Sequence, residues 1–145
     1  MADEVVFFTG VPDKFDFACR LVRKKYREGV RLAVYGPPGL LSRLDQALWA
    51  EPERDFLPHV RLKPGAAVPG DAVLTRVWLL EQPEPGLRCD NALNLGIDAV
   101  DGLLQHDRVA EVVGQDDDDR AAGQVRWKRY KAVGAPITHR AHGQR

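Results

Sequence analysis

Residues with the chemistry for phosphate binding or catalysis are scattered along this sequence. Gly36-Pro37-Pro38-Gly39 follows a predicted strand, where a doubly wound fold would place a phosphate-binding loop. A phosphate cradle requires backbone N–H groups, and the two prolines remove two of them. The segment also lacks a Gly-Lys-Ser/Thr sequence. We interpret it as a structural turn; the alternative is a small nucleotide-dependent enzyme.

The histidines and cysteines do not form a recognisable metal or nucleophile site. His139 and His142 are spaced as a His-x-x-His pair, without the cysteine or carboxylate that would complete a zinc ligand set. His59 has no nucleophile near it in the sequence, and Cys19 and Cys89 lack Cys-x-x-Cys spacing. We therefore expect no catalytic residue, no metal and no cofactor.

An acidic run, Asp116 to Asp119, lies at the start of a helix predicted from Asp117 to about Lys131. Carboxylates at a helix N-terminus accept its free backbone N–H groups and interact favourably with its dipole. We interpret the run as a helix cap, and a metal site is the alternative.

Basic and polar side chains form one face of this last helix. Arg120, Gln124, Lys128 and Lys131 are spaced i, i+4, i+8 and i+11, and Trp127 lies at the edge of their face. One interpretation is a solvated face with a half-packed tryptophan. The other is a site for an acidic peptide with an aromatic or apolar anchor. Direct binding of single-stranded nucleic acid is a weaker alternative, because the adjacent acidic run would repel phosphates.

The helix predicted over residues 40–49 leaves a large aromatic side chain outside its apolar face. Leu41, Leu44 and Leu48 share that face, and Trp49 lies roughly 120° from its centre. Trp49 either caps the core or belongs to an apolar docking patch, since tryptophan is enriched at interface hot spots. Two apolar residues follow downstream: Phe56 and Pro58.

The composition is that of one ordinary globular domain. The chain has 145 residues, of which 44% are hydrophobic and 29% charged. Its 21 basic and 21 acidic residues balance, which argues against a dedicated DNA-binding protein. No apolar run approaches the roughly 18 residues of a membrane span, and the acidic start is unlike a signal peptide. We therefore expect a cytoplasmic protein that does not bind membranes.

Predicted strands and helices alternate along the chain. Strands are expected at residues 5–8, 31–35, 72–80, 89–95 and 109–113, and helices at 14–28, 40–49, 98–104 and 117–131. Strands joined by long helical connections pair in parallel. The predicted fold class is α/β, a three-layer sandwich in which helices flank a mostly parallel sheet. We expect one domain over residues 1–136 and a polar, frayed C-terminal tail over 137–145.

Two segments resemble the chi subunit family of bacterial DNA polymerase III. They are Leu44–Trp49 together with Phe56–His59, and Arg126–Gly134. The order of elements and the chain length also fit, so the resemblance covers essentially the whole chain, although residues 62–107 resemble the family only in pattern. The resemblance implies a Rossmann-like fold without a nucleotide and a non-enzymatic adaptor in the clamp-loader assembly.

The resemblance also implies two protein-binding surfaces. Trp49, Phe56 and Pro58 match the surface that binds the psi subunit, or in some bacteria a repair helicase. The second surface would bind the acidic, Phe-terminated C-terminal tail of single-stranded-DNA-binding protein. Its residues would be Val113, Arg120, Gln124, Trp127, Lys128 and Lys131. At Gln124 the family can have an arginine that contacts the tail, and Trp127, Lys128 or Arg126 could compensate for its absence.

Overall fold

The computed structural model describes residues 1–50, 57–70 and 74–142. Within them the chain forms a single sheet of seven strands whose pairings are all parallel. The strands are β1 (Glu4–Val11), β2 (Leu32–Tyr35), β3 (Val60–Leu62), β4 (Val77–Leu80), β5 (Asn91–Asn94), β6 (Arg108–Gly114) and β7 (Ile137–Ala141). The helices are α1 (Lys14–Arg27), α2 (Pro38–Ala50), α3 (Val100–Leu103) and α4 (Asp117–Ala132).

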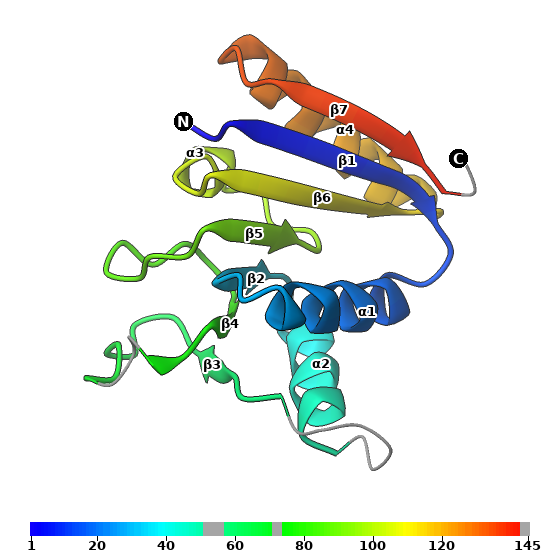
Figure 1. Ribbon diagram of the computed structural model, residues 1–145. Coiled ribbons are helices and arrows are strands. Elements are labelled where there is room, and N and C mark those ends of the chain that lie inside the picture. Colours follow the sequence, from blue (N-terminus) through cyan, green and yellow to red (C-terminus); the bar gives the residue numbers. More distant parts are fainter. Residues whose placement is uncertain (51–56, 71–73, 143–145) are drawn as a thin grey trace.

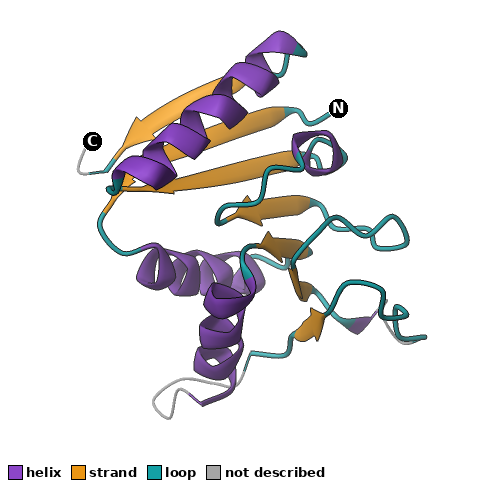
Figure 2. Ribbon diagram, turned by 180° about the vertical axis from the view of Figure 1, so that it is seen from behind, coloured by secondary structure: helices purple, strands orange, loops and turns teal. Residues whose placement is uncertain are grey.

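The helices cover both faces of the sheet, which makes three layers. The strand order is β3-β4-β2-β5-β6-β1-β7. Helices α1 and α2 lie on one face (Figure 1), and α4 crosses β6, β1 and β7 on the other, with α3 beside it (Figure 2). Each face has its own core of buried apolar side chains, because successive residues of a strand point to opposite faces. The predicted α/β sandwich with a Rossmann-like parallel sheet is confirmed.

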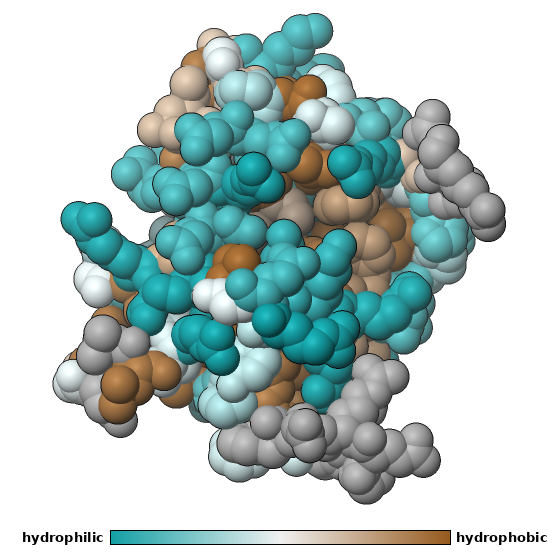
Figure 3. All heavy atoms as spheres, viewed as in Figure 1, coloured by the Kyte–Doolittle hydropathy of each residue, from teal (hydrophilic) through white to brown (hydrophobic). Residues whose placement is uncertain are grey.

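The outer surface of the α1 and α2 layer is mainly polar. Figure 3 shows hydrophilic side chains over most of this face, with an apolar area right of the centre of the view. Beneath it, Leu41, Leu44 and Leu48 of α2 are fully buried against the sheet, as their helical spacing predicted.

The prediction of a frayed tail was wrong for residues 137–141. They form β7, an edge strand that pairs with β1 from Val5 with Ile137 to Thr9 with Ala141. An edge strand needs few apolar residues, because its backbone bonds to one neighbour while its other side faces water. The polar composition of this segment therefore concealed a strand.

The remaining differences concern short elements. The strand predicted over residues 72–80 is β4, residues 77–80, and residues 71–73 lie outside the described part of the chain. Strand β3 was not predicted, because three residues are too few to show a period. Helix α3 is a single turn within the segment predicted to be helical.

Candidate functional sites

Helix α4 has a defined start and a defined end. The Asp116 side chain accepts a hydrogen bond from the backbone N–H of Asp119 at 2.7 Å, so the predicted helix cap is confirmed. At the other end Gly134 has φ 79°, and its N–H and that of Ala135 donate to the carbonyls of Lys131 and Tyr130. This pattern is a Schellman motif, which turns the chain from α4 into β7.

A glycine lets α4 approach the sheet closely. A Cβ atom on Gly123 would lie 2.8 Å from Cγ2 of Val113, a buried residue of β6. That separation is shorter than a carbon–carbon contact allows. Gly123 therefore fixes how near the helix lies to β6 and how the residues on either side of it are spaced.

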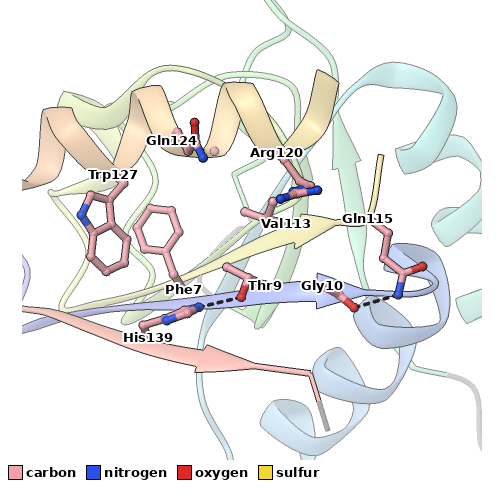
Figure 4. Close-up of a pocket in the computed structure, with 10 residues that line it drawn as sticks. Phe7, Thr9, Gly10, Val113, Gln115, Arg120, Gln124, Trp127 and His139 are labelled. Carbon is pink, nitrogen blue, oxygen red and sulfur yellow. Dashed lines mark hydrogen bonds between the residues drawn. The ribbon is translucent and has the colours of Figure 1, made fainter. Parts of the chain in front are cut away.

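A cavity of about 480 Å³ opens between α4 and the strands β6, β1 and β7 (Figure 4). Its apolar lining comes from Phe7, Val113 and Trp127. The rings of Phe7 and Trp127 pack edge to face with centroids 5.0 Å apart. Its other lining residues are Thr9, Gly10, Gln115, Arg120, Gly123, Gln124 and His139.

The structure brings together four of the six residues predicted for the tail-binding surface. Val113, Arg120, Gln124 and Trp127 line the cavity. The other two predicted residues, Lys128 and Lys131, are exposed on α4 and are not part of the lining.

Arg126 cannot contribute to this surface, so the idea that it compensates for Gln124 is wrong. Its side chain is 1% exposed, and its Nε donates to Oε1 of Glu111 at 2.9 Å. Arg126 lies on the side of α4 that faces the sheet, where it serves a buried ion pair.

The electrostatic character of the cavity is basic. Arg120 is exposed, and its guanidinium lies 3.9 Å from the exposed carboxylate of Asp117. Asp119 is turned away: it pairs with Lys14 at 3.1 Å and accepts a hydrogen bond from the N–H of Gly114. Among the described residues that line the cavity, none is acidic. None of the carboxylates of the acidic run therefore lines the cavity.

The sheet side of the cavity contains two polar residues that the sequence did not place there. The Thr9 hydroxyl lies 2.6 Å from Nε2 of His139, and the His139 ring meets Trp127 edge to face at 6.0 Å between centroids. Nothing in the sequence around His139 predicted this position, because it depends on the pairing of β7 with β1.

A buried polar cluster holds the inner side of α4 on the sheet. Glu111 of β6 accepts hydrogen bonds from Arg126 at 2.9 Å, Tyr130 at 2.7 Å and Asn94 at 2.9 Å. Burial raises the pKa of Glu111, while Arg126 and the bonds from Asn94 and Tyr130 act in the opposite direction. Burial and the adjacent carboxylate also raise the pKa of Tyr130, so its hydroxyl keeps the proton that it donates. A glutamate in an otherwise apolar strand was the available sequence signal for such a cluster.

The second predicted surface lies at the end of α2. Trp49 is 59% exposed, although its helix buries three leucines. Its ring packs edge to face on His59, with centroids 5.6 Å apart. The ring nitrogens of the buried His59 contact Oδ1 of Asp45 at 2.6 Å and the carbonyl of Leu57 at 2.8 Å. Pro58 is exposed nearby in the chain, and Phe56 lies outside the described residues.

The contact between His59 and Asp45 was not anticipated. The sequence offered no partner for His59, because Asp45 is 14 residues away on α2. The pair fixes the segment that follows the undescribed residues 51–56 against α2, beside Trp49.

A cavity of about 510 Å³ lies at the carboxyl ends of the strands, and Lys14 is one of its lining residues. In doubly wound folds, ligands bind at this edge. Here Lys14 extends across it, donates to the carbonyl of Leu95 after β5 and pairs with Asp119 of α4. The Gly36–Gly39 segment turns directly into α2, which begins at Pro38.

The described residues offer neither a cluster of metal ligands nor a membrane-spanning helix. No group of three or more His, Cys, Asp or Glu side chains among them is placed to hold a metal ion. None of their helices has the length and apolar character needed to cross a membrane.

These features define a single-domain α/β protein with a parallel, Rossmann-like sheet and a basic surface cavity lined by aromatic residues. The chain belongs to the DNA polymerase III chi subunit family: residues 2–138 match the family described as DNA polymerase III chi subunit, HolC. It is similar to DNA polymerase III subunit chi of Pseudomonas aeruginosa, with 28% identity over 125 residues that cover 86% of this chain and 83% of the relative. The corresponding protein of Escherichia coli K12 is 26% identical over 117 residues, 80% of this chain and 77% of its own length.

Proposed function

We propose that this chain is a cytoplasmic, non-catalytic accessory subunit of DNA polymerase III that acts as an adaptor. One surface binds the psi subunit, and through it the clamp loader. A second surface binds the acidic C-terminal tail of single-stranded-DNA-binding protein. Membership of the chi family supports the replisome role. The observation that carries the tail-binding half is the basic, aromatic-lined cavity beside α4.

The cavity suits a peptide that ends in an aromatic residue preceded by carboxylates. Phe7, Val113 and Trp127 provide an apolar surface for the terminal ring. Arg120 is at the same cavity and donates to carboxylates. Gln124 lies one helical turn further along α4 and offers a neutral donor.

The remaining basic residues extend the positive surface beyond the cavity. Lys128 and Lys131 are exposed on the same helix and would attract acidic residues upstream of the terminal ring. Their contribution is electrostatic attraction, which salt weakens.

The surface proposed for psi, or for a repair helicase in its place, contains Trp49 and Pro58. The large exposed area of Trp49 is what an interface anchor requires. The contacts of His59 with Asp45 and with the Trp49 ring limit the freedom of this anchor before binding. Phe56 is assigned to the same surface on the resemblance alone.

The tail-binding half is tested with a fluorescein-labelled peptide that contains several aspartates and a C-terminal phenylalanine. Fluorescence anisotropy should show saturable binding to the wild type. Arg120→Ala or Lys128→Ala should raise Kd by about three- to tenfold, the loss of a charge-assisted contact near the surface. Gln124→Arg adds a cation to the cavity and should lower Kd.

The charge-matched control is Arg27→Ala, an exposed arginine of α1 on the other face of the sheet. It should leave Kd unchanged. Absence of saturable binding to the wild type at low salt would refute this half of the proposal, and so would an equal effect of Arg27→Ala and Arg120→Ala.

A further inference from the structure

The cavity beside α4 has one side with a fixed positive charge and one whose charge depends on protonation. Arg120 is the permanently charged lining residue on α4, and Gln124 next to it is neutral. Figure 4 shows His139 on β7, across Phe7 and Val113 from these two residues. An imidazolium at this position would double the positive charge of the lining.

The contacts of His139 are compatible with both of its protonation states. Its Nε2 lies 2.6 Å from the Thr9 hydroxyl, which can either donate or accept. Its ring is also held edge to face by Trp127, with an interplanar angle of 87°. In the described part of the chain Nδ1 has no hydrogen-bond partner. In the imidazolium both nitrogens donate, so the Nδ1–H remains for a ligand.

The groups around His139 are neutral or basic. From β1 it meets Thr9 and Phe7, neither of which titrates in the neutral range. From α4 it meets Trp127 and shares the cavity with Arg120. Further basic groups on the same elements are Lys128 and Lys131, which are exposed on α4, and His142 just after β7, whose backbone N–H donates to the Thr9 carbonyl.

We propose that His139 is a titratable anion-binding residue of this cavity, which as an imidazolium binds a carboxylate of the acidic tail. The inference rests on the proposed function, because the tail supplies the carboxylate. Binding and protonation favour each other by the same factor. Histidine changes charge between roughly pH 5 and pH 8, whereas aspartate side chains stay ionised over this range. The cavity therefore binds the tail more tightly at the acidic end of the range.

The labelled aspartate and phenylalanine peptide is titrated at about pH 5.5 and about pH 8, where the wild-type Kd differs by about three- to tenfold. In His139→Asn that difference falls below about twofold. Asparagine keeps a polar contact with Thr9 but cannot gain a charge. His142→Asn retains the wild-type pH dependence. Thermal unfolding of each variant confirms that the fold is intact.

The outcomes separate this inference from the proposed function. A pH dependence in His139→Asn equal to that of the wild type overturns the role of His139. Binding that is weakened by Arg120→Ala but independent of pH in the wild type also overturns it, and leaves the proposed function standing. Failure of the wild type to bind the peptide at either pH overturns both. Loss of the pH dependence in His142→Asn would show that His142, and not His139, gains the proton, and would refute the proposal.

Discussion

Arg126 and Arg129 are three residues apart on α4 but lie in very different environments. Arg126 is buried and pairs with the buried Glu111 at 2.9 Å. Arg129 pairs with Asp101 of α3 at the same distance, but the side chains of both residues are mostly exposed. Water screens the second pair, so the two pairs differ in what their loss costs.

Replacing Arg126 with alanine should lower the free energy of unfolding by about 3–5 kcal/mol, because Glu111 would be left as an uncompensated buried charge. Arg129→Ala, the matched control on the same helix, should cost no more than about 1 kcal/mol. Urea denaturation of both variants measures the difference. Equal losses would show that Glu111 and Arg126 do not act as a buried pair.

At this scale the sequence predicted some residues and not others, for a physical reason. The exposure of Trp49 and the position of Trp127 at the edge of a basic face follow from helical geometry within one segment. The environments of Arg126 and His139 depend on strands distant in sequence, Glu111 in β6 and Thr9 in β1. Local spacing carries no information about such contacts.

Helix α4 can lie close to the sheet because Gly123 has no side chain. Glycine costs a helix roughly 1 kcal/mol relative to alanine, so the position would gain stability from alanine if space allowed. The 2.8 Å approach of a Cβ to Val113 removes that space, because a buried, branched side chain has little freedom to move.

Gly123→Ala should therefore destabilise the protein by about 1 kcal/mol, the balance of improved helix propensity and overpacking. It should also weaken binding of the acidic peptide, since Gly123 and Val113 both line the cavity. Thermal unfolding and peptide titration measure the two effects. Gly39→Ala in α2, where a Cβ meets nothing within 4 Å, is the control. A stabilised Gly123→Ala variant that binds the peptide normally would contradict this account of the helix position.

Most elements could be predicted from the sequence, because they contain enough residues to show a pattern of polar and apolar positions or a clear start and end. Helices α1, α2 and α4 each contain more than three turns. Polar and apolar faces are distinct in α1, whereas α4 buries Gly123, Arg126 and Tyr130 and was delimited by its acidic start and by Gly134. Strands β3 and β7 could not be predicted in this way. The first is three residues long, and the second is polar because it lies at the edge of the sheet.

The two proposed binding surfaces lie on opposite faces of the molecule. Trp49 lies in the last turn of α2, on the α1 face near the β3 edge of the sheet, whereas the cavity lies beneath α4 at the β7 edge (Figures 1 and 2). Distant substitutions with no shared neighbours have additive effects. Under the proposed function, this separation lets the two partners bind at once without one excluding the other.

Trp49→Ala should abolish binding of psi, with a loss of affinity of about thirtyfold or more, and should leave the Kd of the tail peptide unchanged. Arg120→Ala should do the reverse. Biosensor titration of immobilised wild type and variants with purified psi and with the peptide measures both affinities. Val125→Ala, an exposed apolar residue of α4 that lies outside the cavity, serves as the control. Loss of both activities in the Trp49 variant would indicate unfolding or coupled sites.

The pairing of β1 with β7 also has a consequence for how the protein is made. The cavity combines Phe7 and Thr9 with His139, so one side of it is synthesised last and the other first. Contacts this distant in sequence form slowly, and during translation they cannot form before β7 leaves the ribosome. The residues of the α2 surface are therefore synthesised well before the cavity can be completed, which requires β7.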